Sequence, residues 1–301
     1  MTIRPMVQGR SRSRSVCLLL SLVFACLYFS QRAVPHFRDS LAVAPQAQPT
    51  VDVDLGSAHD SFSFVVYGDI RFTDPHNTRD TDPARRVALI NRIVGERPDF
   101  LVITGDLVLQ GDRSSDWEVF NQETRPLRDA RIQIFPVMGN HDMDLSVSLA
   151  RENWRRQFPR FQHRWNSLRY GNLLFLMLHS ESDTRPGSPQ RKWMESHLDR
   201  LPAGIDFFVV THHPSYTRFT SRRHSRRSSE QRLAKFLEER QKTVQAKIFE
   251  LSGHVHNYER YQNGGVMYIV TAGGRLPTPC PVSLATSTVT LVPRITTANS
   301  P

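Results

Sequence analysis

Cysteine is scarce in this sequence, and its positions exclude a fold stapled by disulfides. The 301 residues include three cysteines, and two of them, Cys17 and Cys26, lie in an apolar stretch near the N-terminus. Without that stretch only Cys280 is left, so no intramolecular disulfide can form. A chain of this length with 39% hydrophobic residues can instead bury a large core in one domain.

The sequence also lacks an even spread of positive charge, although its net charge is +10. Residues 1–14 contain four arginines and no acid, and the run RRHSRRSSEQR at 222–232 contains five arginines and one glutamate. Because these two segments carry most of the excess, the rest of the chain is not a basic nucleic-acid binder, and we expect no specific nucleic-acid partner. The arginine run predicts either a solvated loop or a surface that recruits an anionic substrate or membrane.

The apolar run near the N-terminus is short for a membrane span. VCLLLSLVFACLYF at 16–29 would cover about 21 Å as a helix, against a bilayer core of about 30 Å. It follows a basic segment, as in secretory signals. Residues 1–33 therefore predict a signal peptide or an N-terminal membrane anchor, with lipid attachment at Cys26 as an alternative. The protein is expected to be exported (periplasmic, secreted or anchored outside the cytoplasm), with no other membrane contact.

Composition divides the remaining chain into three parts. Residues 34–60 have several prolines and no apolar period, which is typical of a linker. Residues 276–301 are rich in proline, serine and threonine, lack aromatic residues, and form a candidate disordered tail. Residues 61–275 lie between them and predict one domain.

Within that domain, apolar strand-like runs alternate with helical periods. The runs that predict strands are 62–69, 99–106, 132–142, 205–214, 246–256 and 264–274, with two more strands in 164–180. Helices are predicted at 83–96, with Val87, Ile90, Ile93 and Val94 on one face, at 114–127, 146–158 and 188–201, and after a capping box of Ser228 and Gln231. This alternation predicts a layered α/β domain.

Five of the predicted strands end in polar motifs. They are GD at 68–69, GD at 105–106, GNHD at 139–142, HHP at 212–214 and GHVH at 253–256. Sites in open α/β sheets form at the carboxyl ends of strands, so these motifs should meet at one edge. Carboxylate, amide and imidazole ligands together suit Mn, Fe, Zn or Co. There are enough of them for two ions, which about 3.5–4 Å apart can activate a bridging water and clamp a phosphoryl group.

These five ordered motifs resemble the calcineurin-like metallophosphoesterase superfamily, which includes purple acid phosphatases and cyclic-nucleotide phosphodiesterases. The resemblance covers about residues 62–275. It implies a single-domain, four-layer α/β/β/α sandwich around two divalent or trivalent metal ions. It also implies hydrolysis of a phosphate ester by a metal-bridging hydroxide, with His141 as the general acid that protonates the leaving oxygen.

The same resemblance implies the metal ligands. Asp69 and His256 would hold the first ion, and Asp106 would bridge both ions. The second ion would be held by Asn140, His212 and His254. Side chains of successive residues in an extended chain diverge, so one of the adjacent histidines should reach the ion. We favour His212 over His213, because in the family the ligand sits two residues before the proline.

Arg71 departs from the pattern of the family. Many members have a metal-binding histidine at this position, whereas arginine stays protonated and cannot bind a metal. Purple acid phosphatases also lack the histidine but have a tyrosine three residues after the bridging aspartate, where this chain has Leu109. His76 or Asp80 could fill the gap. We interpret Arg71 as a catalytic residue that contacts the substrate phosphate; the alternatives are a salt bridge at the rim and a damaged metal site.

Three functions are therefore considered. Metal-dependent hydrolysis of a phosphate monoester or diester is favoured. The first alternative is a non-catalytic relative that binds phosphorylated ligands, with its first metal site damaged by Arg71. The second is a membrane-tethered interaction module.

Asp142, next to the predicted acid His141, is interpreted as a residue that holds the loop or orients His141 rather than as a metal ligand.

Overall fold

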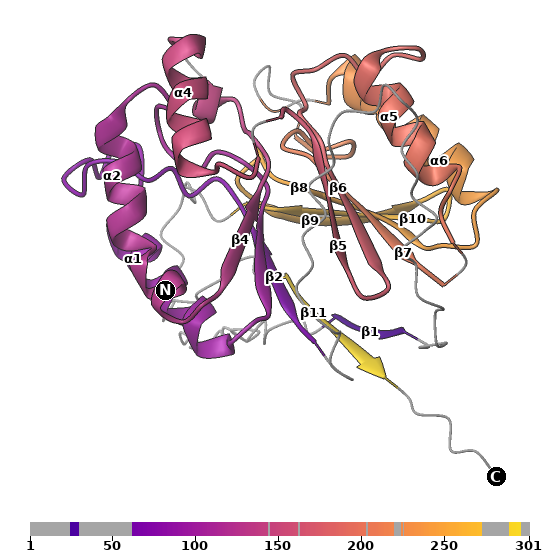
Figure 1. Cartoon of the computed structure of the whole chain (residues 1–301), viewed down its shortest axis with the longest axis horizontal. Coiled ribbons are helices and arrows are strands. Elements are labelled where there is room, and N and C mark those ends of the chain that lie inside the picture. Colours follow the sequence, from indigo (N-terminus) through magenta and orange to yellow (C-terminus); the bar gives the residue numbers. More distant parts are fainter. Residues whose placement is uncertain are drawn as a thin grey trace, which may run out of the picture.

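The computed structural model describes residues 25–29, 62–143, 145–161, 163–202, 204–219, 224, 226–272 and 289–295. It consists of two sheets with helices on their outer faces (Figure 1). Most of the predicted leader, linker and tail lies outside the described residues, so that division of the chain stays a prediction. No helix within the described ranges is both long and apolar enough to cross a membrane.

The first sheet has five strands of mixed direction. Its strand order is β1 (Ala25–Phe29), β11 (Val289–Ile295), β2 (Phe64–Tyr67), β3 (Phe100–Ile103) and β4 (Gln133–Pro136). β11 pairs antiparallel with β2. The pairs β2–β3 and β3–β4 are parallel, so both strands before the Gly-Asp motifs end on the same side as β4. β1 falls within the predicted leader and β11 within the predicted tail.

The second sheet has six strands. Its order is β5 (Asn166–Tyr170), β6 (Leu173–Met177), β7 (Asp206–Val210), β8 (Ile248–Ser252), β10 (Val266–Thr271) and β9 (Tyr258–Asn263). The strands β6, β7, β8 and β10 are parallel, and β5 and β9 are antiparallel edge strands. The HHP and GHVH motifs follow β7 and β8, so their loops leave the same edge of this sheet.

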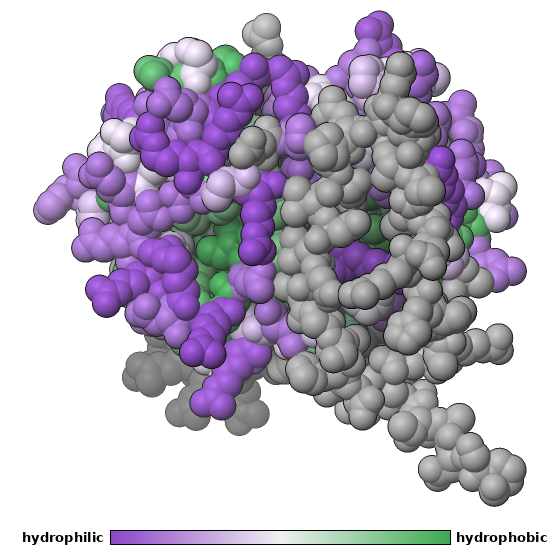
Figure 2. Space-filling view, in the orientation of Figure 1, coloured by the Kyte–Doolittle hydropathy of each residue, from purple (hydrophilic) through white to green (hydrophobic). Residues whose placement is uncertain are grey.

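The helices form the two outer layers. Beside the first sheet lie α1 (Pro83–Glu96), α2 (Ser114–Glu123), α3 (Arg125–Asp129) and α4 (Val147–Gln157), and beside the second lie α5 (Pro189–Leu198) and α6 (Ser228–Gln241). The exposed face of the first helical layer is mainly hydrophilic (Figure 2). The predicted α/β/β/α sandwich is therefore confirmed.

Alternation along the strands builds two cores. Phe64 of β2 packs edge-to-face on Phe175 of β6 and Phe208 of β7, with ring centroids 5.3 and 5.7 Å apart, and this contact joins the two sheets. Phe207 and Val209 alternate with Phe208 along β7, so they point to the other face of the sheet and pack in a second cluster with residues of α5 and α6. Burial on both faces explains why these strands read as continuous apolar runs.

Three local expectations were wrong. In α1 the buried positions are Arg86, Leu89, Ile90 and Ile93, so Val87 lies off the buried face and is 48% exposed. Arg86 can be buried because its guanidinium pairs with Glu123 at 2.7 Å. Helix α6 has Arg227 as its N-cap, without a side-chain cap, so the predicted capping box does not form. The strand β9 was missed because its mixed polar sequence, YERYQN, carries little apolar signal.

Candidate metal centre

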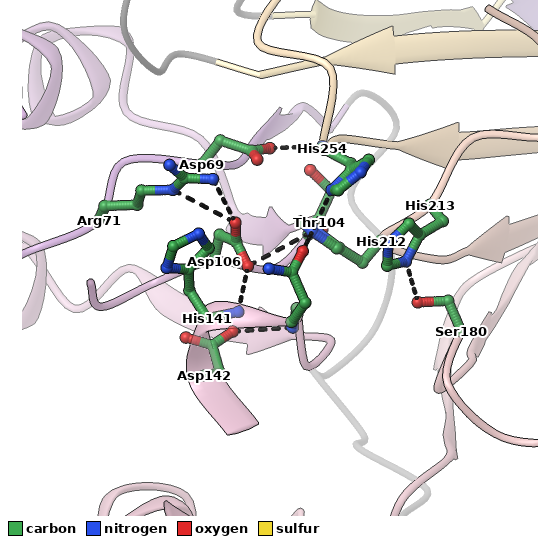
Figure 3. Close-up of polar contacts among 12 residues, drawn as sticks. Asp69, Arg71, Thr104, Asp106, His141, Asp142, Ser180, His212, His213 and His254 are labelled. Atoms are coloured by element: carbon green, nitrogen blue, oxygen red, sulfur yellow. Dashed lines mark hydrogen bonds and ion pairs between the residues drawn. The ribbon is translucent and has the colours of Figure 1, made fainter. Parts of the chain in front are cut away.

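The polar motifs lie in loops that meet between the carboxyl ends of the two sheets. Asp69 and Asp106 follow β2 and β3, and Asn140 follows β4 of the first sheet. His212 and His254 follow β7 and β8 of the second sheet. Figure 3 shows the two aspartates converging with His212 and His254 from the two sheets. Asp69, Asp106 and His212 offer ligand atoms that all lie within 4.8 Å of one another.

Three ligand atoms lie close to a fourth, His212 Nε2. This nitrogen lies 3.1 Å from Asn140 Oδ1, 3.2 Å from His254 Nδ1 and 3.3 Å from Asp106 Oδ1. Metal–ligand bonds of about 2.0–2.1 Å in a tetrahedral site separate the ligands by about 3.4 Å, so these spacings fit one divalent ion. The other nitrogen of His212, Nδ1, lies 2.9 Å from the carbonyl of Thr104, which orients Nε2 toward the cluster.

A second, smaller group of donors lies around Asp69. Its Oδ1 is 3.5 Å from His256 Nε2, and neither atom has a hydrogen-bond partner among the described residues. Both atoms are buried, and a buried polar atom without a partner is costly unless a ligand satisfies it. The pair is thus chemically suited to a cation. Asp69 Oδ2 is already engaged, because it accepts a hydrogen bond from the His254 amide at 2.8 Å.

Arg71 lies inside the cluster and not at its rim. Its Nη2 and Nε donate to Asp106 Oδ2 at 2.9 and 3.3 Å (Figure 3). The side chain of Arg71 is 16% exposed and that of Asp106 is fully buried. The backbone amide of Arg71 also donates to the carbonyl of Asp106, at 3.0 Å. The guanidinium thus holds one oxygen of the carboxylate predicted to bridge two metal ions.

His141 is held by two contacts of its own. Its amide donates to Asp106 Oδ1 at 2.9 Å, and its Nδ1 lies 2.8 Å from the carbonyl of Leu109. Because a carbonyl only accepts, Nδ1 carries a proton in this contact. The chemistry of the side chain therefore resides on Nε2.

Asp142 joins the loop after β3 to the loop after β4. Its Oδ1 accepts hydrogen bonds from the amides of Leu107 and Val108 at 2.8 and 3.2 Å, and its Oδ2 accepts one from Gly139 at 2.8 Å. Burial and the nearby charge of Asp106 raise the pKa of Asp142 to about 7. Its place in the loop agrees with the structural role that we expected.

The charges within the cluster support one another. Burial by itself raises the pKa of Asp69, but the neighbouring His256, His212 and Arg71 hold it below its ordinary value. Burial likewise opposes ionisation of Asp106, and the charges of His212 and Arg71 leave its pKa lowered. The pKa of the buried His212 is raised because both carboxylates outweigh the effect of its burial. Both aspartates therefore stay ionised, as metal ligands must.

The loops adopt backbone conformations that side chains rarely take. Positive φ angles occur at Asp69 (59°), Arg71 (55°), Asp106 (54°), His254 (70°) and His256 (51°). Residues in this left-handed region cost about 1–3 kcal/mol each and cluster at functional sites. Five of them around one cluster indicate that the surrounding packing imposes the geometry of the site.

Close approach of the loops depends on the glycines of the motifs. A Cβ on Gly139 would overlap the carboxylate and amide of Asp106, and one on Gly253 would overlap the carboxylate of Asp69. The missing side chains at these two positions let the loops approach the ligands closely.

Three nearby residues have hydrogen-bond partners outside the cluster. The side chain of His76 is 94% exposed and contacts Asp74, and Asp80 accepts from Asn77, so neither replaces the missing histidine at position 71. His213 offers a ligand atom within 4.8 Å of those of His212 and His254, but its Nδ1 contacts Ser180 Oγ at 2.8 Å and its ring packs on that of His254 at 4.0 Å.

Sequence reasoning missed three neighbours of the cluster. The carbonyl of Thr104 orients His212, and Ser180 holds His213. The ring of His224 lies 5.2 Å from that of His254 and 5.7 Å from that of His256. His224 is the one histidine inside the arginine run of residues 222–232, a signal that could have been noticed.

Comparisons with known proteins agree with this architecture. A probable purple acid phosphatase 20 from Arabidopsis thaliana is 26% identical over 179 residues, which cover 54% of this chain and 40% of that protein. The structure of purple acid phosphatase PPD1 from yellow lupin, Lupinus luteus, matches with a TM-score of 0.57 and 19% identity, over 77% of this chain and 47% of that one. The chain thus spans less than half the length of either protein.

A smaller solved protein and a family model extend the comparison. A dimetal phosphatase from Danio rerio matches with a TM-score of 0.50 and 12% identity, over 69% of this chain and 86% of that one. The model of the calcineurin-like phosphoesterase family matches residues 62–258, which include all five motifs. The chain therefore belongs to the calcineurin-like phosphoesterase family, whose members are metal-dependent.

Proposed function

We propose that this protein hydrolyses phosphate esters with a bound divalent metal ion, and that the ligands come from the five motifs. The observation that carries the proposal is the set of donor atoms from three different loops within 3.3 Å of His212 Nε2. Such a convergence of amide, carboxylate and imidazole groups has no structural purpose as evident as metal binding.

The ligands would be Asp106, Asn140, His212 and His254. The other ion, named first in the prediction from the sequence, would have Asp69 and His256 as its donors. When bound, metal provides an activated water and neutralises charge on the phosphoryl group. The metal could be Mn, Fe, Zn or Co, because mixed nitrogen and oxygen donors suit each of them.

His141 would act as the general acid. The contact of Nδ1 with the Leu109 carbonyl, together with the Asp106 contact to the amide, holds the imidazole in one orientation. A doubly protonated imidazole held this way offers its Nε2 proton to the leaving oxygen of the substrate. The residue is half-buried, so a substrate can reach it from solvent.

Arg71 would bind the substrate phosphoryl group. A guanidinium has five N–H donors, and the contacts with Asp106 use those of Nε and one of Nη2. The remaining donors suit an oxygen of a phosphoryl group. Anchored in this way, Arg71 provides a fixed positive charge where negative charge develops during displacement at phosphorus.

The test is turnover of a chromogenic phosphodiester and the matching monoester by the full chain. Metal-stripped protein should be inactive, and Mn²⁺ should restore turnover in the wild type but not in a His212→Ala variant purified in parallel, which controls for a contaminating phosphatase. If the folded wild type binds phosphate but turns over neither ester with Mn²⁺, Zn²⁺ or Co²⁺, hydrolysis is ruled out. The non-catalytic phosphoryl-binding alternative, which the Arg71–Asp106 contact favours, would then hold.

Two further features remain predictions of the sequence. Export follows from the leader at residues 1–33, and the substrate class follows from the family alone.

In the arginine run, Arg227 is engaged by Glu230 and Glu181, both at 2.7 Å, which favours an internal role for that residue over recruitment of anions.

A further inference from the structure

We propose that the centre holds one metal ion per chain, in the half built on His212, and that the Arg71 guanidinium takes the place of a second cation. This inference rests on the proposed metal-dependent hydrolysis and changes the number of ions expected from the sequence.

The His212 half is complete without Arg71. Asp106 Oδ1, Asn140 Oδ1 and His254 Nδ1 lie 3.1–3.3 Å from His212 Nε2, so four protein atoms can share one ion. This number exceeds the three protein ligands typical of catalytic zinc, so the water of the proposed hydrolysis would take a fifth position.

The other half has too few donors. Asp69 Oδ1 and His256 Nε2 are the two atoms there without a hydrogen-bond partner among the described residues. Asp106 Oδ2 belongs to the carboxylate predicted to bridge both ions, and Arg71 occupies it with two N–H groups. Two protein donors are fewer than catalytic metal sites ordinarily use. His76 and Leu109 provide no replacement, since His76 is exposed and leucine has no donor atom.

Arg71 is not readily displaced from this half. Its backbone is tied to the chain segment of Asp106 by an amide hydrogen bond of 3.0 Å, and its φ of 55° reflects a conformation imposed by the fold. Its guanidinium keeps its charge at any ordinary pH. A second dication would therefore have to bind beside a fixed positive charge, with both of them competing for Asp106 Oδ2.

The charges of the centre lead to the same conclusion. The carboxylates of Asp69 and Asp106 are buried, and Arg71 already neutralises part of their charge. One divalent ion then makes the centre positive, which suits an anionic phosphate ester, whereas a second ion would add repulsion without a new ligand. The Asp69 and His256 pair then remains available to hold a water near the ion.

The experiment counts ions. The full chain, stripped of metal, is dialysed against Mn²⁺ or Zn²⁺ and its metal content measured by mass spectrometry. We expect about one ion per chain in the wild type, and in Mn²⁺-loaded protein the electron paramagnetic resonance of an isolated ion and not of a spin-coupled pair. Two ions per chain in the wild type, with a coupled spectrum, would overturn the inference.

An Arg71→His variant sharpens the test. It removes the fixed charge, frees Asp106 Oδ2 and adds an imidazole donor, so we expect the content to rise to about two ions. Arg71→Lys keeps the charge and should stay at one ion, and His76→Ala, an exposed histidine of the same loop, is the matched control and should also stay at one. If a folded Arg71→His variant still binds one ion, Arg71 is not what limits the count, and the inference fails.

These outcomes are separable from failure of the proposed function. One ion per chain without ester hydrolysis would leave the inference standing and remove the enzyme. Two ions per chain with ester hydrolysis would overturn the inference and support the proposed function. No bound metal at all, in protein whose circular dichroism shows a folded chain, would overturn both.

Discussion

The amide of His254 donates to Asp69 Oδ2 at 2.8 Å, and this bond joins the loops that follow β2 in the first sheet and β8 in the second. The other oxygen of Asp69 lies 3.5 Å from His256, so one carboxylate holds both histidines of the GHVH motif near the centre. The site is thus divided between the two sheets. Its geometry depends on the packing of aromatic residues such as Phe64 and Phe175 between them.

The adjacent histidines give the first prediction. His212→Ala should weaken Mn²⁺ or Zn²⁺ binding by more than about 100-fold, above the 10–100-fold typical of residues that only orient a ligand. His213→Ala should weaken it by less, because His213 contacts Ser180 and packs on His254 without belonging to the His212 Nε2 cluster. Isothermal titration with metal ions measures both. Equal losses would mean that the two histidines share the ion.

His141 gives the second prediction. His141→Ala should lower kcat by about 10²–10⁴-fold for an alkyl phosphate ester, because its leaving oxygen needs a proton. The loss should be smaller for a p-nitrophenyl ester, whose leaving group is stable as an anion. Steady-state kinetics on both esters give the ratio. Metal content should not change, and a loss independent of the leaving group would exclude the general-acid role.

Gly139 gives the third prediction. Gly139→Ala should lower the free energy of unfolding by about 1–3 kcal/mol and weaken metal binding, because the new methyl group would displace the Asp106 carboxylate. The control is Gly95→Ala in α1, where an added Cβ meets nothing within 4 Å. That variant should be stabilised by about 0.5–1 kcal/mol. Urea unfolding of the metal-free proteins measures both, and equal behaviour of the two variants would contradict the close approach.

Glu250 gives a prediction on pH. It is fully buried in β8, its Oε1 accepts from the Ser215 amide at 2.8 Å, and its Oε2 has no hydrogen-bond partner within the described structure. Burial raises the pKa of Glu250 to about 7; the charge of Glu230 adds to the increase, and Ser215 and Arg226 oppose it. Its carboxyl group should therefore be protonated in the folded protein at pH 5.

The sign of the effect follows from the proton count. From about pH 5 to about pH 7 the unfolded chain has lost the proton that folded Glu250 still holds, so the stability contributed by this group falls over that interval and is lost above about pH 7. Replacing it by Glu250→Gln should remove about 3 kcal/mol of that decline. Urea unfolding of metal-free wild type and variant at both pH values isolates the term. Parallel pH profiles would show that Glu250 is ionised in the fold.

Local pattern determined much of this protein. Strand runs, most helix ranges and the polar motifs at strand ends could be located from the sequence. Burial determines where apolar residues occur along each strand and helix, and this spacing can be seen in a short stretch of sequence. The order of five motifs identified the family, and Ser188 does cap α5 by accepting from the amide of Arg191. Polar edge strand β9 and the exposed Val87 were misjudged, because there the outcome depends on which neighbours cover the element.

What the tertiary structure decided is the charge arrangement of the centre. From the sequence, Arg71 could have contacted substrate, formed a salt bridge at the rim or damaged the site, and His76 could have reached the metal. The fold turns His76 to solvent and sets the Arg71 guanidinium on Asp106 Oδ2. Arg71 and Asp106 are separated by 35 positions in the sequence. They are brought together by the pairing of β2 with β3 and by the conformation of the loops that follow, and no local sequence period encodes either of these.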